Sequence, residues 1–382
     1  MTNSRFDLYR GPSRPLSKTR RRFLQVAGAA LSSMALASCR QGGLADVQSG
    51  TTTSPSSGAS DTLHVYSWSG YFDDELLNNF REATGIKVIA DIFDSNETML
   101  AKLQAGGGNN YSIIYPSDYM VQQMIELKML TELDKSKLTV LDGLLDKFKN
   151  PVYDPNNTHS VPAVWGTTGL VYNSEKVNPA PTDWDYLWQN KNKLSRRLTL
   201  FNDVREVMGA TLRSLGYSYN STNPKEIEAA YKKLLELKPA ITNFTTDGWR
   251  DQLLTGDLWI AMGYSSDAIG VIDENPKIKY VVPSSGSSLW TDTMAIPKTA
   301  PNVEAAYAWI NYTLEPKNAA VITERLKFAT ASKKAIDLLP ADLKANTNLF
   351  PSASVLSKCE GVAPIGNAVE IYDRYWTQLT SS

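Results

Sequence analysis

Carboxylate side chains offer the clearest chemistry in this sequence, and two places stand out. Asp203 and Glu206 lie three residues apart at the start of an amphipathic segment, and Asp292 lies within an otherwise apolar, strand-like run. The three-residue spacing suits a helix capping box, in which each side chain accepts a hydrogen bond from a free backbone N–H. It also suits the carboxylate pair of a glycosidase. A carboxylate inside a buried strand, such as Asp292, needs a partner for its charge.

Other reactive side chains are scarce. The 382 residues include two His and two Cys, which leave little material for a metal site or a disulfide framework. His64 and His159 are isolated from each other, and we find no convincing nucleophile–base motif. The 39 basic and 40 acidic side chains nearly cancel, whereas a nucleic-acid-binding protein normally carries a basic excess. We therefore predict no metal, no cofactor and no nucleic-acid partner, with a carboxylate-dependent hydrolase as the enzymatic alternative.

The N-terminal segment differs from the rest of the chain. Residues 1–38 carry seven basic side chains and one acidic one, and an apolar stretch runs from Phe23 to Ala37. A basic region, a short apolar region and a small-residue end are typical of an export signal. The string around Arg20–Arg22 resembles a twin-arginine signal, and the same arginines also suit a general secretion signal. We predict export to the periplasm.

A lipid anchor is predicted at the end of this signal. The string Leu36-Ala37-Ser38-Cys39 resembles a bacterial lipobox, in which the cysteine is acylated and becomes the mature N-terminus. Residues 40–60 are rich in Ser, Thr and Gly, so we predict a flexible tether over residues 39–60. Without residues 1–38 the chain has 32 basic and 39 acidic side chains, a formal charge of −7. An acidic body suits a cationic ligand, and it also serves solubility.

Strands and helices must position these carboxylates. From residue 62 onward the sequence alternates between strand and helix patterns, which predicts an α/β fold with parallel sheets. The predicted strands are Leu63–Trp68, Lys87–Ala90, Tyr111–Tyr115, Gly169–Tyr172, Leu198–Phe201, Leu258–Met262 and Lys279–Val282. The first predicted helix begins near Asp73 and ends near Gly85. The other predicted helices are Glu97–Gln104, Tyr119–Leu127, Val204–Leu215, Pro224–Leu237, Gly248–Thr255, Glu304–Asn311, Pro316–Leu326 and Ala368–Leu379. The length suggests two domains.

Seven strings occur in the order of one protein family. They are Val65–Ser69, Phe80–Val88, Ser95–Met99, Pro116–Tyr119, Val161–Gly166, Asp203–Val207 and Trp290–Pro297. Together they resemble the periplasmic spermidine/putrescine-binding proteins of bacterial polyamine ABC transporters. The resemblance covers the chain from about residue 62 to the C-terminus.

The resemblance implies a two-lobed periplasmic binding protein of type II, with a ligand cleft between the lobes and hinge crossings. Lobe 1 would comprise residues 61–168 plus 291–338, and lobe 2 residues 169–290 plus 339–382. The lobes would close on the ligand by a hinge motion, and the membrane permease of the transporter would recognise the closed form. We expect a monomer that captures putrescine, spermidine or both and has no enzymatic activity.

The family's binding site carries over residue by residue. The implied ligand contacts are the aromatic residues Trp68, Tyr71, Tyr119, Tyr264, Trp290 and Phe328, the carboxylates Asp203, Glu206 and Asp292, and the hydroxyl residues Ser69 and Ser117. Such a set suits a polyamine, because carboxylates compensate the buried ammonium groups and aromatic faces pack on the methylenes and attract the cations. Asp292 with Trp290 would hold an inner ammonium, and Asp203 with Glu206 the other amines.

Three positions depart from the family. Gly70 stands where the family has an acid, Phe328 where it has Tyr, and Val362 roughly where it has Gln. Asp118 or Asp267 would supply a replacement charge, although each also suits an exposed loop or the start of a helix. These departures leave the choice between putrescine and spermidine open. Another small solute, such as a sugar or an amino acid, remains the alternative ligand, because the same architecture serves several ligand classes.

Overall fold

The computed structural model describes residues 61–381. The predicted signal, the lipidation of Cys39 and the tether therefore lie outside the described residues. Within these residues, no helix is both long and apolar enough to cross a membrane. The fold is mixed α/β, as predicted from the alternating pattern.

The ten strands found in the described part of the chain join into one hydrogen-bonded sheet in the order β2-β1-β3-β9-β4-β7-β5-β6, with β10 and β8 also paired to β4. Their bounds are β1 Thr62–Trp68, β2 Lys87–Phe93, β3 Ile113–Ile114, β4 Ser160–Asn173, β5 Leu198–Leu200, β6 Ile241–Phe244, β7 Ile260–Tyr264, β8 Ile278–Val281, β9 Leu289–Ala295 and β10 Ala329–Thr330. Every strand predicted from the sequence has a counterpart here, and β6 and β10 were not predicted.

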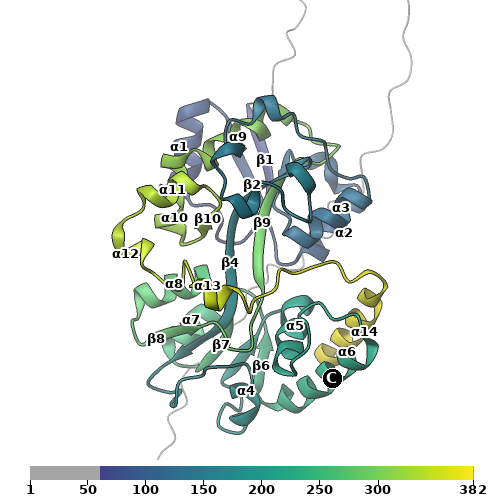
Figure 1. Cartoon of the computed structure of the whole chain (residues 1–382), viewed down its shortest axis with the longest axis vertical. Coiled ribbons are helices and arrows are strands. Elements are labelled where there is room, and N and C mark those ends of the chain that lie inside the picture. Colours follow the sequence, from purple (N-terminus) through teal and green to yellow (C-terminus); the bar gives the residue numbers. More distant parts are fainter. Residues whose placement is uncertain (1–60, 382) are drawn as a thin grey trace, which may run out of the picture. The chain divides into compact units, whose positions relative to one another are not determined.

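Strand β4 links two lobes (Figure 1). Its first part, Ser160–Thr167, pairs antiparallel with β9 on the side of β1, β2 and β3, and its second part, Thr168–Asn173, pairs antiparallel with β7 and β8. The expectation of purely parallel sheets is therefore wrong. Pairs such as β1–β2 and β5–β7 are parallel, but β4 and β9 cross between the lobes in opposite directions. The exact division of the lobes at residues 168, 290 and 338 stays a prediction.

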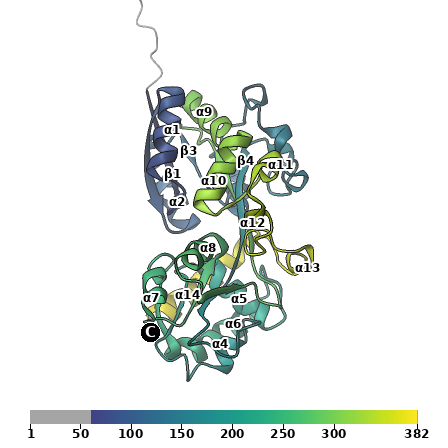
Figure 2. The ribbon, with the colours of Figure 1, turned by 90° about the vertical axis from the view of Figure 1, so that its left-hand side faces the viewer.

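Helices cover the faces of the sheet in both lobes (Figures 1 and 2). Their bounds are α1 Asp74–Thr84, α2 Asn96–Gln104, α3 Asp118–Glu126, α4 Tyr186–Gln189, α5 Val204–Ser214, α6 Pro224–Leu237, α7 Trp249–Thr255, α8 Ser265–Glu274, α9 Val303–Leu314, α10 Pro316–Leu326, α11 Lys333–Leu338, α12 Ala341–Lys344, α13 Ala353–Leu356 and α14 Val369–Ser381. Local signals set many of the ends. Asp73 caps α1 by accepting from the N–H of Leu76 at 2.8 Å, and Gly85 ends α1 at φ 76°.

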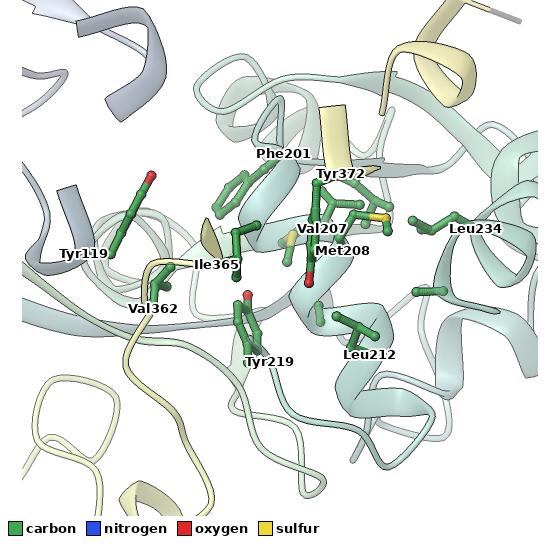
Figure 3. Close-up of a cluster of buried hydrophobic side chains, with 14 of the residues drawn as sticks. Tyr119, Phe201, Val207, Met208, Leu212, Tyr219, Leu234, Val362, Ile365 and Tyr372 are labelled. Carbon is green, nitrogen blue, oxygen red and sulfur yellow. The ribbon is translucent and has the colours of Figure 1, made fainter. Parts of the chain in front are cut away.

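The helix α5 shows how packing anchors one wall of the future site. Its Val207, Met208 and Leu212 are buried, and they belong to one cluster with Leu234 of α6 and Tyr372 of α14 (Figure 3). Burying three such apolar side chains contributes several kcal/mol to folding. The N-terminal end of α5 is therefore held rigidly where the two lobes meet.

Candidate functional site

A cavity that is partly open to solvent is lined by residues of both lobes. The end of β1, the strand β9 and the first residues of α3, α5 and α8 contribute to its walls. All eleven side chains predicted as ligand contacts line it: Trp68, Ser69, Tyr71, Ser117, Tyr119, Asp203, Glu206, Tyr264, Trp290, Asp292 and Phe328. The structure thus brings the predicted set together, and its role in binding a ligand stays a prediction.

Asp292 of β9 lies at the first-lobe wall, 6% exposed. Its Oδ1 accepts a hydrogen bond of 2.6 Å from the Ser117 hydroxyl, and its Oδ2 accepts one from the Tyr71 hydroxyl. Ser117 is itself held by Asn96, which accepts from its N–H and donates to its Oγ, both at 3.0 Å. The sequence predicts that a carboxylate buried in this strand needs a partner. The partners of Asp292 are two neutral hydroxyl groups.

Asp203 and Glu206 form the opposite wall at the start of α5. Oδ1 of Asp203 accepts hydrogen bonds from the backbone N–H groups of Arg205 and Glu206, at 2.8 and 3.1 Å. Glu206 does not return a bond to Asp203, because its carboxylate accepts from the Tyr219 hydroxyl at 2.7 Å and from the Ser288 hydroxyl at 2.9 Å. Only half of the predicted capping box is present. Capping occupies one oxygen of Asp203 and leaves the other available at the cavity.

Aromatic rings line the first-lobe side of the cavity. Trp68 packs on Phe93 with ring centroids 4.5 Å apart, and its indole N–H donates to the Tyr115 carbonyl at 3.0 Å. The Tyr71 ring lies 4.5 Å from that of Phe328. Phe328 therefore keeps the wall that a tyrosine would provide but lacks the hydroxyl group. These contacts fix the rings in place before a ligand arrives.

The remaining predicted aromatics are Tyr264 and Trp290, where the lobes meet, and Tyr119 of the first lobe. Tyr264 packs edge-on against Trp290 at 5.6 Å and tilts over Phe201 at 4.4 Å. Tyr119, the second residue of α3, donates a hydrogen bond of 2.9 Å to Glu97. The Trp290 indole N–H is buried without a hydrogen-bond partner in the described part of the chain. Aromatic faces therefore occur on both walls.

Asp118 is a buried member of the site. It begins α3 as predicted, but the expectation that this acid is exposed is wrong, since it is 7% exposed. Its Oδ1 accepts from the N–H of Tyr119 at 2.8 Å, and the residue lines the cavity. Asp267, in the first turn of α8, also lines the cavity, but Arg250 compensates its charge at 2.7 Å.

Four buried carboxylates in this cavity have no ion-pair partner among residues 61–381: Asp118, Asp203, Glu206 and Asp292. Burial raises the pKa of Asp203 to about 6 and that of Asp292 to about 6. It also raises the pKa of Glu206, and it raises the pKa of Asp118 well above its usual range. The nearby Arg205 guanidinium lowers the pKa of Asp118, Asp203 and Glu206, but burial outweighs this effect. In the described residues no group of His, Cys, Asp or Glu side chains is arranged to hold a metal ion.

The sequence model of one protein family, the bacterial extracellular solute-binding proteins, matches residues 75–351 of this chain. The chain belongs to this family. It is 38% identical over 320 residues to the spermidine/putrescine-binding periplasmic protein of Salmonella typhimurium, covering 84% of this chain and 91% of that one. Among solved structures, the spermidine/putrescine ABC transporter substrate-binding protein of Streptococcus pneumoniae superposes with a TM-score of 0.71 at 36% identity, covering 84% and 98% of the two chains. A lipoprotein of Treponema pallidum gives 0.76 at 28% identity, covering 84% and 100%. The fold of this solute-binding protein is therefore the predicted two-lobed type II fold.

Two arginines of this solute-binding protein also line the cavity, and the sequence analysis did not identify them. Arg205 turns its guanidinium to Asn220 Oδ1 at 3.0 Å and to the Ala363 carbonyl at 2.8 Å, while it stacks over Tyr119 at 5.3 Å. The second is Arg250, the partner of Asp267. Arg205 adjoins Asp203 and Glu206 in sequence, which is the only signal for it, and nothing local indicates Arg250.

Two of the positions predicted to depart from the family, Gly70 and Val362, can be located in the structure. Val362 lines the cavity and belongs to the same buried cluster as Tyr219 (Figure 3). Gly70 has φ 77°, a left-handed conformation that favours glycine, and a Cβ atom there would meet no atom within 4 Å. Gly70 therefore adds no charge to the site, and Val362 adds apolar surface.

Proposed function

We propose that this protein captures a polyamine, putrescine, spermidine or both, in the cavity between its lobes and delivers it to the permease of an ABC transporter. The observation that carries the proposal is the set of four buried carboxylates without ion-pair partners in an aromatic cavity. Relatives that are 38% identical bear the name spermidine/putrescine-binding, which agrees with this chemistry.

The physical argument begins with desolvation. An ammonium group that enters a buried cavity loses its water, and the loss is tolerated only if carboxylates and other acceptors replace that water. We propose that Asp292, beside Trp290, holds one ammonium group and that Asp203 and Glu206 hold another. The aromatic rings pack against the methylenes, and a cation over such a ring gains roughly 0.5–2 kcal/mol.

The alternative ligands fit less well. An amino acid would place its carboxylate among acidic side chains, which repel it. A neutral sugar would leave the carboxylate charges uncompensated. A glycosidase needs its two carboxyl groups on either side of the scissile bond, whereas Asp203 and Glu206 both project from the first turn of α5. We therefore propose that the protein has no enzymatic activity.

We further propose a periplasmic, monomeric protein that is anchored through a lipid on Cys39 and closes its lobes on the ligand. The antiparallel strands β4 and β9, which connect the lobes, are the proposed hinge. The described residues contain no helix able to cross a membrane, so the proposed anchor depends on the N-terminal cysteine.

Calorimetric titration of the mature protein tests the proposal. Putrescine, spermidine and spermine are compared with amino acids of each charge class and with neutral sugars at one ionic strength. We expect saturable one-to-one binding for at least one polyamine and none for glutamate or glucose. Binding of a sugar or an amino acid with no polyamine binding contradicts the proposal, and turnover of an added glycan contradicts its non-catalytic part.

A further inference from the structure

One carboxylate of the cavity forms an ion pair with an arginine of the protein itself. Arg250 is the second residue of α7, and Asp267 lies in the first turn of α8. Nη2 of Arg250 lies 2.7 Å from Oδ1 of Asp267 and 3.4 Å from Oδ1 of Asp247. All three residues line the cavity. Arg250 thus makes with Asp267 the contact that a ligand ammonium group would otherwise make.

The Arg250–Asp267 pair differs from the fully buried charged groups of the cavity. The carboxylates Asp118, Asp203, Glu206 and Asp292 have only hydroxyl or backbone partners, and Arg205 points its guanidinium to an amide and a carbonyl oxygen. Arg250 and Asp267 are partly exposed, with 30% and 19% of their side chains accessible. A cation of the ligand can therefore reach Asp267 once the guanidinium is removed.

Asp267 also lies within electrostatic range of the inner part of the site. Burial, then Asp292, and to a smaller extent Asp267 raise the pKa of the Tyr71 hydroxyl, which donates its hydrogen bond to Asp292. A ligand held at Asp292 therefore extends through a region that the charge of Asp267 reaches. A longer polyamine has a further ammonium group to place there, and a diamine does not.

We propose that Arg250 is a specificity-determining residue that substitutes for one ammonium group of the ligand. With Arg250 in place, Asp267 is unavailable, and the cavity favours polyamines with fewer charges. Replacing the guanidinium by a neutral side chain turns Asp267 into an additional amine subsite and shifts the preference toward longer polyamines. This inference rests on the proposed function, because it concerns the selection of polyamine length.

The test compares the affinities of wild type and Arg250→Met for putrescine, spermidine and spermine by calorimetry. Methionine keeps much of the length of the side chain and removes its charge. A newly available hydrogen bond to a charged group is expected to raise the spermine-to-putrescine affinity ratio about tenfold or more. An unchanged ratio overturns the inference and indicates that the pair merely joins α7 to α8. If wild type binds none of the three amines, the proposed function itself fails, and this outcome is distinct.

Two further variants make the test specific. In the double variant Arg250→Met/Asp267→Asn the gained preference for spermine should disappear, because the new subsite loses its charge. Persistence of the gain without Asp267 contradicts the inference. Asp267→Asn alone should lower putrescine affinity far less than Asp292→Asn does, because Arg250 and not the ligand holds this carboxylate. Equal losses in the two single variants overturn the inference even if Arg250→Met does not fold, and circular dichroism checks the folding of every variant.

Discussion

At the scale of single residues, the site combines polar groups that are individually unfavourable in a folded protein. Asp292 is buried and its only described hydrogen-bond donors are the neutral hydroxyl groups of Tyr71 and Ser117. Two hydroxyl donors stabilise its ionised form but do not cancel its charge. The unliganded protein therefore carries a free-energy cost that a bound cation removes.

The first prediction concerns Asp292→Asn. The variant keeps the size of the side chain and removes the charge, so polyamine affinity should fall roughly 10- to 100-fold, as expected for the loss of a hydrogen bond to a charged group. Calorimetry measures the affinity. The matched control is Tyr71→Phe, which removes one donor to Asp292 but keeps the charge, and its loss should be smaller. Unchanged affinity in Asp292→Asn contradicts the assigned role.

The second prediction is a pH dependence. Burial raises the pKa of both Asp203 and Asp292 to about 6, and only the ionised carboxylates bind the polyamine, whose amines stay protonated below pH 8. Affinity should therefore be highest above pH 7 and fall as the pH drops through 6, by up to about tenfold per pH unit for each group. Titrations at pH 5, 6, 7 and 8 measure it. Constant affinity over this range contradicts the prediction.

The raised pKa values have the opposite effect on folding stability: the ionised carboxylates favour binding but destabilise the ligand-free fold. A carboxylate whose folded pKa lies above its unfolded value binds protons more tightly in the folded state, so its contribution to stability falls as the pH rises from about 4 to about 6. Asp292→Asn should therefore raise the free energy of unfolding of the ligand-free protein at pH 7.5, by about 1–3 kcal/mol. Urea denaturation measures it. Equal or lower stability than wild type would show that the hydrogen bonds of Asp292 outweigh its desolvation.

At the scale of elements, the N-terminal ends of helices bring the carboxylates to the cavity, and loops hold them there. Asp203 caps α5, and Tyr219 fixes Glu206 through its hydroxyl. The loop of Tyr219 is held in turn by Glu360, which accepts from the Tyr219 N–H at 3.1 Å and pairs with Arg213 at 2.7 Å. The C-terminal segment thereby positions a carboxylate to which it is not adjacent in sequence.

The two roles of Asp203 can be separated by substitution. Both substitutions remove the same buried charge, but serine is also a good N-cap residue, so Asp203→Ala should be about 0.5–2 kcal/mol less stable than Asp203→Ser. Both variants remove the carboxylate and should lose polyamine affinity to a similar extent. Thermal unfolding and calorimetry measure the two effects. Retained affinity in Asp203→Ser would assign the residue to capping alone.

At the scale of the whole described chain, contacts across the cavity connect the two lobes. Lys327, directly after α10, forms an ion pair of 3.3 Å with Asp273 of α8. Figure 2 shows α10 in the first lobe lying above α8 in the second. Arg205 of α5 likewise stacks on Tyr119 of α3. Under the proposed closure of the lobes, such contacts would stabilise the closed arrangement, and the apparent affinity would depend on the population of that arrangement.

We therefore predict that Lys327→Met lowers polyamine affinity about two- to fivefold, the range for a partly exposed ion pair. The loss should shrink at high salt, because ions screen the pair in the wild type. Titrations at 50 mM and 500 mM NaCl measure it. The exchange Lys327→Asp/Asp273→Lys should restore most of the affinity at low salt. Failure of the exchange, or a loss that does not depend on salt, speaks against an electrostatic link between the lobes.

Local chemistry in the sequence determined much of the architecture. Helix ends followed from capping residues such as Asp73 and Gly85, and the bounds of α6 and α10 were correct because proline at the first position marks their starts. The eleven site residues followed from the resemblance to a family, eight of them within the shared strings, and each of the eleven lines the cavity. The helix α8 was missed, because Gly270 and β-branched residues lower its intrinsic helix propensity and burial against the sheet supplies its stability.

Only the tertiary structure decided what these residues can do together. Asp118 looked like an acid of an exposed loop or a helix start, and its burial results from packing of α3 against β9 and from the approach of Gly361. Arg250 and Asp267 meet because α7 and α8 pack side by side, and no local spacing indicates that contact. The antiparallel crossing of β4 and β9 likewise depends on pairing between residues more than a hundred positions apart. Helix capping and hydrophobic periodicity involve residues that are close in sequence, so they can be predicted from it. The charge balance of a cavity depends on packing between residues that are far apart in sequence.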